Sequence, residues 1–506
     1  MEKTVQIYYT SDTHGHIFPV NYAAGCPENS GLLNLAAQVE KDGNTLVLDG
    51  GDSLQGTPLT QYYLEHRDQW PVHPVAAAFN AMGLDYFTLG NHDFNFGYEA
   101  LRDYLWAMDG VCLCTNVEDL GGELRIRPWA VHTLANGLRV GLTGVVTDFV
   151  NVWEQPQNLE KIRVTDAFQA AQATCAALRD QCDVCVCIYH GGFEEELETG
   201  RMLSDSGENL ACRIARELDF DLLLTGHQHM AVEGVELSGT WAVQPPANAG
   251  QFLRITGQWD GRGTRFHSRL TPVGSKHQAE PYQSLLSLER AVQVWLDQPI
   301  GELAPPIPPE GKLDAALHGS RVAALFNQVQ LAETGADFSC TSLGNDPVGL
   351  ASPVTMRGVT AAYLFANTLV VLEVTEEVLR QTLERCASYF TLVDGQPQIS
   401  EEFLLPKVEH YNYDFYAGLA YTFDLRRPVG SRVVRLAKLD GSPLGGGTFR
   451  LCTSNYRATG TGGYEILREC PVLWLGGVEM PDLTVRYIQT HSPVPQLHNA
   501  EMRVIW

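Results

Sequence analysis

Five short blocks of residues that can bind metal ions are spread over the first half of the chain. They follow one another as Ser11-Asp12-Thr13-His14, Gly50-Gly51-Asp52, Gly90-Asn91-His92-Asp93, His190-Gly191-Gly192 and Gly226-His227-Gln228-His229. Carboxylate and imidazole ligands suit borderline divalent cations such as Zn, Mn, Co or Fe(II). If the fold brings the blocks together, they form a metal centre.

A strand-like run precedes each block. The runs are QIYYT, TLVLD, DYFTL, DVCVCIY and DLLLT. Residues 1–275 alternate strand and helix patterns, which implies a mainly parallel sheet. In an open α/β sheet, functional groups gather just beyond the carboxyl ends of the parallel strands. We therefore expect the five blocks to converge in one cleft.

The spacing within the blocks fits ligands. Residues one apart on an extended segment can point the same way, as in Asp12 with His14 and His227 with His229. Asp52 is single and central, as a bridging carboxylate would be, and Asn91 offers a neutral carbonyl oxygen. Any one of these motifs alone is more often a cap, a turn or a surface histidine. The ordered set of five favours a metal centre.

Composition excludes several classes of partner. The chain has 506 residues and a formal net charge of −25, which repels polymeric nucleic acid and anionic lipid. A small anionic substrate still fits if bound cations reverse the field locally. No apolar run approaches the ~18 to 20 residues that a membrane helix needs. The sequence carries no signal for an oligomeric state.

The 12 cysteines bear on the cellular compartment. Several lie in apolar strands, where free thiols behave as small hydrophobic groups. Cys182 and Cys185 form a C-x-x-C that opens a strand, and we favour core packing over a metal or redox role. With no secretory signal in view, we expect a reducing cytoplasm, or export if a leader precedes this sequence.

The length indicates more than one domain. We predict one domain over residues 1–275, a linker with a hinge helix over 276–305, and a second α/β or α+β domain over 306–506. The hinge helix covers 281–296, and prolines at 305–306 and 308–309 then break regular structure. Thr165 and Thr375 are predicted helix caps, and a further helix is expected near 319–332.

The combined motifs point to a known family. The series D-x-H, G-D, G-N-H-[DE], H, G-H-x-H resembles the calcineurin-like metallophosphoesterase superfamily. Farther on, FANTLVV (365–371) and NYRATGTGGY (455–464) resemble the 5′-nucleotidase C-terminal domain. The resemblance implies an N-terminal four-layer α/β/β/α sandwich followed by a second α/β (α+β) nucleotide-binding domain.

The same resemblance implies a site with two divalent cations, whether Zn, Mn, Co or Fe. One ion would be held by Asp12, His14, Asp52 and His229, and the other by Asp52, Asn91, His190 and His227. His92 would be the catalytic histidine that faces the phosphate. Asn95 stands where the 5′-nucleotidase branch has an aspartate, so His92 and Asn95 are the expected catalytic pair.

That asparagine indicates the substrate class. The form G-N-H-D-F-N-F-G resembles the 2′,3′-cyclic-nucleotide phosphodiesterase/3′-nucleotidase branch, as does the Y-N-Y-D run at 411–414. We therefore expect a small-molecule nucleotide substrate, cyclic 2′,3′ or 3′. The predicted substrate-binding residues are Tyr456, Tyr413, Tyr411, Asp414 and Asn455, with tyrosines stacking on the base.

Three alternatives remain on the sequence alone. The nearest is a 5′-nucleotidase or UDP-sugar hydrolase of the same family. A second is a non-catalytic nucleotide-binding protein on the same fold, which the intact Asp52, Asn91 and His92 disfavour. A third is a thiol-linked sulfur-oxidation hydrolase, and no residue here points to sulfur chemistry.

Overall fold

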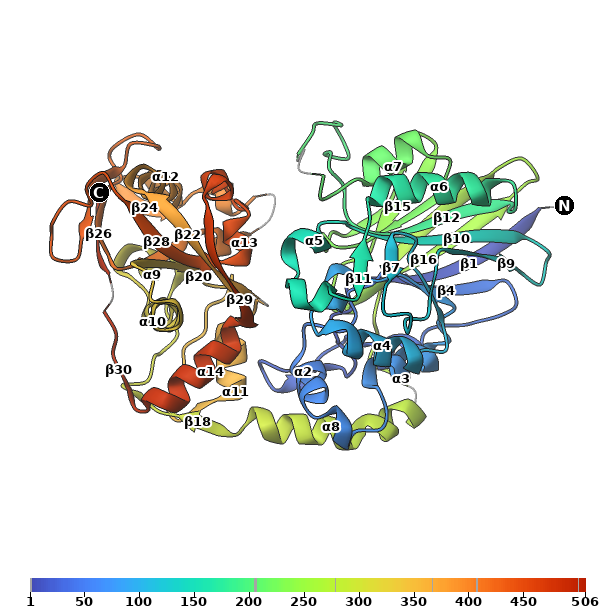
Figure 1. The fold of residues 1–506 in the computed structure, drawn as a ribbon, viewed down its shortest axis with the longest axis horizontal. Coiled ribbons are helices and arrows are strands. Elements are labelled where there is room, and N and C mark those ends of the chain that lie inside the picture. Colours follow the sequence, from blue (N-terminus) through green and yellow to red (C-terminus); the bar gives the residue numbers. More distant parts are fainter. Residues whose placement is uncertain (1, 204–206, 278, 366, 406–407, 499) are drawn as a thin grey trace. The chain divides into compact units, whose positions relative to one another are not determined.

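The computed structural model describes residues 2–203, 207–277, 279–365, 367–405, 408–498 and 500–506. The chain divides into two compact units, residues 1–293 and 294–506 (Figure 1). The predicted linker, 276–305, spans this division, and helix α8 (Ala279–Leu296) lies within it, two residues longer at its start than predicted. In the part of the chain that is described, no helix is long and apolar enough to cross a bilayer.

The first sheet of the N-terminal unit has parallel strands at its centre. Its strand order is β17-β16-β1-β4-β5-β6-β8. In that order the strands cover Thr264–Pro272, Gln251–Trp259, Lys3–Thr10, Thr45–Asp49, Tyr86–Phe87, Val111–Leu113 and Ile126–Arg127. From β1 to β8 the strands run parallel, whereas β16 pairs antiparallel with both β1 and β17.

A second sheet repeats this plan with the order β14-β15-β13-β12-β10-β9. The strands cover Val232–Leu237, Thr240–Gln244, Leu222–Thr225, Val184–His190, Arg139–Val146 and Trp129–Thr133. The four inner strands are parallel, and the edge strands β14 and β9 are antiparallel to their neighbours. Every residue of β12 is buried, which its continuous apolar run (VCVCIYH) predicts for a parallel strand covered on both faces.

The two sheets pack face to face. One buried cluster joins Ile7 and Leu48 of the first sheet to Leu142 and Ile188 of the second. Helices α6 (Ala167–Arg179) and α7 (Ala211–Glu217) pack on the outer face of the second sheet. Helices α3 (Pro74–Met82) and α4 (Gly97–Ala107) lie beyond the first sheet (Figure 1). The predicted four-layer α/β/β/α sandwich is confirmed, and the parallel strands belong to two sheets instead of one.

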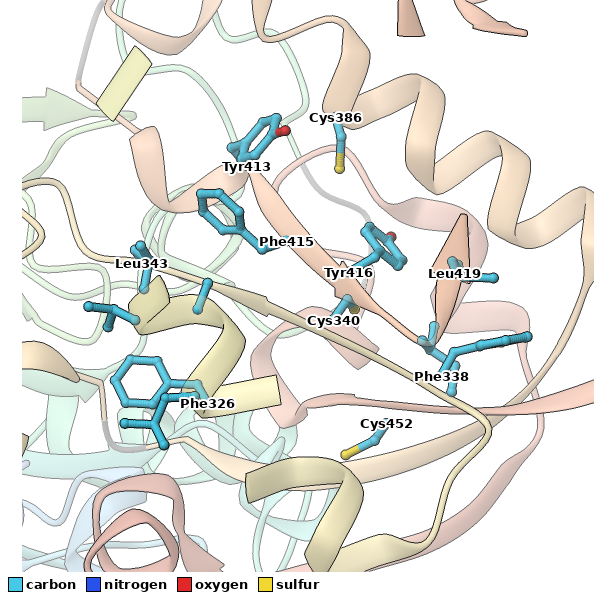
Figure 2. Packing of buried hydrophobic residues seen from close by; sticks show 14 of the residues in the cluster. Phe326, Phe338, Cys340, Leu343, Cys386, Tyr413, Phe415, Tyr416, Leu419 and Cys452 are labelled. Carbon is cyan, nitrogen blue, oxygen red and sulfur yellow. The ribbon is translucent and has the colours of Figure 1, made fainter. Parts of the chain in front are cut away.

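The C-terminal unit is built on its own core. Its larger sheet has the order β25-β20-β28-β22-β29 and a smaller one the order β27-β26-β31. The strands cover Asp414–Ala417, Phe338–Ser342, Thr448–Ser454, Thr368–Thr375, Val472–Glu479, Val433–Lys438, Leu419–Asp424 and Glu501–Ile505. Helices α10 (Arg321–Thr334), α12 (Glu376–Ala387) and α14 (Met480–His491) contribute to one hydrophobic cluster with the strands. Figure 2 shows part of that cluster.

The predicted caps differ in outcome. The Thr375 hydroxyl accepts from the Val378 amide and caps α12, as predicted. The Thr165 prediction is wrong by one residue, because Asp166 caps α6 by accepting from the Gln169 amide. Either residue type can cap a helix, so sequence alone does not separate neighbouring candidates.

A close approach between the two sheets predicts a destabilising substitution. An added Cβ at Gly144 in β10 would lie 1.8 Å from the backbone oxygen of Leu113 in β6. Gly144→Ala should therefore lower the free energy of unfolding by about 1–3 kcal/mol, as overpacking does. Urea denaturation followed by circular dichroism measures this. Gly263→Ala is the matched control, since a Cβ there meets no atom within 4 Å. Equal stability of the two variants would contradict close packing of the sheets.

Candidate active site

All five sequence blocks lie at or just beyond strand ends. Strands β1, β4 and β5 of the first sheet lead into the first three blocks, and β12 and β13 of the second sheet lead into the last two. A hydrogen bond between His190 Nδ1 and the Gly50 carbonyl oxygen (2.7 Å) links the two sheets at this end. The Tyr9 hydroxyl also donates across, to the Thr225 carbonyl oxygen (3.0 Å).

The predicted ligands sit on unusual backbone. Positive φ angles occur at Asp12 (54°), His14 (47°), Asp52 (57°), His227 (71°) and His229 (57°). A non-glycine residue held in this left-handed region costs about 1–3 kcal/mol, and such strain gathers at functional sites. Neighbouring turns hold each other in place: the Asp12 amide donates to Gly51 O and the His14 amide to Asp52 O, both at 2.9 Å.

Asp12, His14 and His229 form one candidate metal group. Their ligand atoms all lie within 4.8 Å of one another. The Nε2 atoms of His14 and His229 are 3.1 Å apart, and His229 Nε2 lies 3.4 Å from Asp12 Oδ1. Asp12 and His14 are buried, whereas the His229 side chain is half exposed. The group therefore opens toward solvent on the His229 side.

Asp52, His190 and His227 form the second group, again with ligand atoms within 4.8 Å of one another. His190 Nε2 lies 3.2 Å from Asp52 Oδ2 and 3.2 Å from Asn91 Oδ1. His227 Nδ1 lies 2.9 Å from the same Asn91 oxygen. The structure thus brings Asn91 into this group, as the sequence predicts.

The hydrogen bonds of the imidazole rings indicate which ring nitrogen carries the proton in the neutral form. In three rings the nitrogen turned away from the cluster faces an oxygen that can only accept: His14 Nδ1 faces Gln55 O (2.9 Å), His190 Nδ1 faces Gly50 O (2.7 Å) and His227 Nε2 faces Glu208 Oε1 (2.9 Å). In the neutral ring each of these nitrogens therefore carries the proton, and the other nitrogen, turned inward, is the one that can present a lone pair to a cation. Lone pairs that face carboxylate and amide oxygens fit a bound cation.

The pKa shifts in the cluster also indicate a site that attracts a cation. Burial disfavours the imidazolium of His190, but the Asp52 and Asp12 carboxylates outweigh it and raise the pKa of His190 to about 10. Burial likewise opposes ionisation of Asp52, yet His190 and His92 hold the pKa of that carboxyl well below its usual value. Burial lowers the pKa of His14 to about 4, which leaves it neutral. The ionised carboxylates attract positive charge to this point, either a second proton on His190 or a bound cation in its place.

His92 lies beside the groups without joining either. Its ring centroid is 5.7 Å from that of His14, in an edge-to-face arrangement, and its backbone amide donates to Asp52 Oδ1 (2.7 Å). Its Nδ1 is 2.8 Å from Asn95 Oδ1. The expected pairing of His92 with Asn95 therefore exists as a hydrogen bond.

Asp93 follows His92 but points away from it. Its carboxylate accepts hydrogen bonds from the backbone amides of Asp52, Ser53, Leu54 and Gly90, at 2.8–3.0 Å. Burial and the charge of Asp52 raise the pKa of Asp93 to about 6. Asp93 thus ties the turn that carries Asp52 to the turn that carries Asn91.

Sequence reasoning missed three neighbours of the site. Glu208 faces His227, the Trp153 ring stacks on the His227 ring (5.4 Å, 23°), and Glu154 accepts from Asn95 Nδ2 (2.7 Å). Trp153 ends the short helix α5 (Val150–Trp153), Glu154 follows it, and Glu208 lies in the loop before α7, and none of the three belongs to a recognisable motif. No local signal in the sequence identifies them, because their role depends on the tertiary fold.

Two of the predicted substrate-binding tyrosines lie where a base could reach them. Tyr456 follows β28 and is 37% exposed. Tyr411 is half-buried, packs edge-to-face with Phe365 (6.2 Å) and donates to Glu409 Oε1 (3.1 Å). Arg457 contacts both tyrosines, because it donates to the Tyr411 carbonyl oxygen (2.9 Å) and its guanidinium lies 5.6 Å from the centre of the Tyr456 ring.

The structure does not support Tyr413 and Asp414 as substrate-binding residues. Tyr413 is 2% exposed, donates to the Ala316 carbonyl oxygen (3.0 Å) and packs on Phe415 within the core (Figure 2). Asp414, also 2% exposed, forms a two-pronged ion pair with Arg457 (2.9 Å for each contact). Tyr413 precedes β25 and Asp414 begins it, and both faces of this strand are buried, so neither side chain reaches the surface.

Asn455 holds two segments of the C-terminal unit together. It begins the short helix α13 (Asn455–Ala458) and is half-buried. Its Oδ1 accepts from the Thr368 amide (3.2 Å). Its predicted contact with substrate stays a prediction.

Comparison with known proteins gives the family. The calcineurin-like phosphoesterase model matches residues 5–231, and the 5′-nucleotidase C-terminal domain model matches residues 300–469. The 2′,3′-cyclic-nucleotide 2′-phosphodiesterase/3′-nucleotidase of Haemophilus influenzae is 24% identical over 90% of this chain and 80% of its own length. The trifunctional nucleotide phosphoesterase protein YfkN of Bacillus subtilis is 24% identical over 96% of this chain, which spans 38% of that protein.

Solved structures agree on the fold. A Staphylococcus aureus protein assigned as a 5′-nucleotidase has a TM-score of 0.84 and 29% identity, covering 99% of this chain and 100% of that chain. The 5′-nucleotidase precursor of Thermus thermophilus has a TM-score of 0.63 and 22% identity, with 99% of both chains covered. This chain is therefore a hydrolase of phosphoester bonds that belongs to the calcineurin-like phosphoesterases carrying a 5′-nucleotidase C-terminal domain.

Proposed function

We propose that the chain is a metal-dependent nucleotide phosphoesterase whose substrates are 2′,3′-cyclic nucleotides and 3′-nucleotides. One observation carries the proposal: two neighbouring groups of imidazole lone pairs and ionised carboxylates converge within 4.8 Å in each group. Such pairs of sites are suited to in-line displacement at phosphorus. The names of the Haemophilus and Bacillus relatives support nucleotides as the substrate class.

We assign seven residues to the binding of two cations. The first group would add Asp52 as a shared carboxylate, because its charge acts on His14 as well as on His190. Two divalent cations held there would supply the charge that lowers the pKa of water and binds phosphoryl oxygens. The mixed oxygen and nitrogen donors suit Zn, Mn, Co or Fe(II). The assigned residues are Asp12, His14, Asp52, Asn91, His190, His227 and His229.

His92 is the proposed proton donor. The ribose oxygen gains negative charge as its bond to phosphorus breaks, and a positioned imidazolium gives it a proton. The Nδ1 edge of His92 is held by Asn95, so the Nε2 edge remains for the leaving oxygen. The ring then returns to its starting state by taking a proton from water.

We propose that Tyr456 and Tyr411 bind the base by stacking. Both rings lie in the C-terminal unit, one exposed and one half-buried. Stacking on an aromatic ring contributes about 1–3 kcal/mol per base and tolerates every base. The same surface would therefore accept purine and pyrimidine nucleotides.

A 5′-nucleotidase is the second candidate. The structures from Staphylococcus and Thermus that share this fold carry that name. Asn95 in place of an aspartate favours the cyclic phosphodiesterase instead.

We also propose a reducing compartment, the cytoplasm. All twelve cysteines are free thiols and most are buried in the cores of the two units. Buried thiols of this kind pack as small hydrophobic groups and form no crosslinks.

A substrate panel tests the proposed activity. After chelation, the protein should hydrolyse neither 2′,3′-cAMP, 3′-AMP nor 5′-AMP, and added Mn, Co or Zn should restore the first two. A time course with 2′,3′-cAMP should show a monoester and then free adenosine. Restored hydrolysis of 5′-AMP alone would support the second candidate, and no hydrolysis with any of these metals would contradict an enzyme.

A substitution tests the shared carboxylate. Asp52→Asn removes the charge assigned to both cations, so we expect the loss of two bound cations per chain and an activity lower by at least about 100-fold. Elemental analysis measures the metal and nucleotide hydrolysis measures the rate. Asp180→Asn, an exposed carboxylate of the same unit, is the control and should change neither. Unchanged metal content in Asp52→Asn would refute the assignment.

A second substitution tests the stacking surface. Tyr456→Ala should raise KM for 2′,3′-cAMP by about 5- to 150-fold, the equivalent of one lost stacking contact. Tyr456→Phe keeps the ring and should behave like the parent. An abasic ribose phosphate offers nothing to stack, so its KM should not change in either variant. Equal effects on both substrates would show that Tyr456 acts through the structure and not through the base.

A further inference from the structure

We infer that Glu154 is a positioning residue for the proposed reaction: through Asn95, it fixes the orientation and the protonated nitrogen of His92. The inference deepens the proposed function and rests on the role of His92 in it. Three hydrogen-bonded side chains carry it. His92 Nδ1 lies 2.8 Å from Asn95 Oδ1, and Asn95 Nδ2 lies 2.7 Å from Glu154 Oε2.

The chemistry of Glu154 decides how Asn95 is turned. A carboxylate can only accept hydrogen bonds, so the Asn95 atom that faces Glu154 must be the amide nitrogen. The amide oxygen of Asn95 then faces His92, and because that oxygen can only accept, His92 Nδ1 must carry a proton. The lone pair of the neutral ring therefore lies on Nε2. Asn95, which replaces the aspartate of the 5′-nucleotidase branch, thus still selects one tautomer of His92. It does so only because Glu154 accepts a hydrogen bond from its amide nitrogen.

Glu154 is itself held in place by other donors. Its second oxygen, Oε1, accepts from the Gln155 amide (2.7 Å) and from Asn158 Nδ2 (2.8 Å). Asn158 also donates to the Asn95 carbonyl oxygen (3.0 Å), which ties the backbone of Asn95 to the same segment. Both oxygens of Glu154 are therefore committed, and the carboxylate cannot turn without breaking several bonds.

The segment that carries Glu154 touches the site a second time. It comprises the short helix α5 (Val150–Trp153) and the 3₁₀ turn Pro156–Leu159. Trp153, directly before Glu154, stacks on the ring of His227. One loop between β10 and α6 thus supports two functional imidazoles, one from each sheet.

The donor and acceptor pattern gives a sharp test. In Glu154→Gln one of the two oxygens becomes an NH2 group, which can only donate. If this NH2 group faces Gln155 and Asn158, it meets two donors, and if it faces Asn95, it meets the donating amide nitrogen of Asn95. In Asn95→Asp two carboxylates face each other. In the double variant N95D/E154Q the new amide donates to the new carboxylate and still accepts from Gln155 and Asn158, so every bond is restored with His92 Nδ1 as donor.

We therefore expect E154Q and N95D each to lower kcat for 2′,3′-cAMP by about 10-fold or more, in the range found for outer-shell partners. The double variant N95D/E154Q should recover to within about threefold of the parent. A p-nitrophenyl phosphoester needs no proton on its leaving group and should lose less rate in each single variant. Glu160→Gln, an exposed carboxylate of the same segment, removes the same charge and should leave both substrates unaffected.

A spectroscopic readout separates this inference from the proposed function. The measurement is 15N NMR of histidine-labelled, Zn-loaded protein, in which the His92 signals are those that disappear in His92→Gln. The His92 ring should be protonated at Nδ1 in the parent and in the double variant. E154Q should mix the tautomers. If E154Q keeps the parent tautomer and the parent ratio of nucleotide to p-nitrophenyl rates, the inference is overturned while the proposed function stands. If the parent protein hydrolyses no nucleotide, the proposed function fails, and the tautomer still reports whether Glu154 orients His92.

Discussion

The structure of the N-terminal unit depends on one constraint: hydrogen-bond acceptor atoms of histidine, aspartate and asparagine side chains converge at one place. In His14, His190 and His227 one ring nitrogen faces a backbone or carboxylate oxygen outside the cluster. The inward nitrogens of His190 and His227 face oxygens of Asp52 and Asn91, and that of His14 faces Nε2 of His229. No hydrogen bond among these atoms satisfies them all, so positive charge is the natural complement. The left-handed backbone at five of the proposed ligands carries strain, and it directs their side chains to a common point.

Around that point the fold supplies rigidity in layers. Each sheet contributes proposed ligands from its strand ends, and the contact between the sheets is apolar and close, as at Gly144 against Leu113. Asp93 then ties two ligand turns together through four backbone amides. The loop around Trp153 and Glu154 supports the imidazoles from outside. In the C-terminal unit, the buried pair of Arg457 and Asp414 has a comparable role beside the tyrosines, since Arg457 also donates to the backbone of Tyr411 and Thr461.

Sequence reasoning went furthest where a residue's role follows from its own neighbours in the chain. The strand runs and the blocks after them are local, so the grouping of the candidate ligands could be predicted. The four-layer fold was implied by the family resemblance of these blocks, since the local patterns alone indicated one sheet where the structure has two. Sequence reasoning went wrong where a role depends on whether a segment is buried: Tyr413 and Asp414, at the start of β25, lie in the core, and only the packing on both faces of that strand shows this. Glu154 and Glu208 could not be predicted, because a lone glutamate in a loop has no pattern that tells which distant imidazole it will meet.

The hydrogen bond from Tyr9 to Thr225 joins residues 216 positions apart in the chain, and the ligands span nearly the same distance, from Asp12 to His229. On the ribosome, the early half of the cation site emerges long before its complement exists. A nascent chain shorter than about that length has carboxylates and imidazoles but no cage, so it cannot retain a cation selectively. A cation that needs both halves of the proposed site would therefore bind only after the chain has been translated through His229, so that the finished geometry would select the ion.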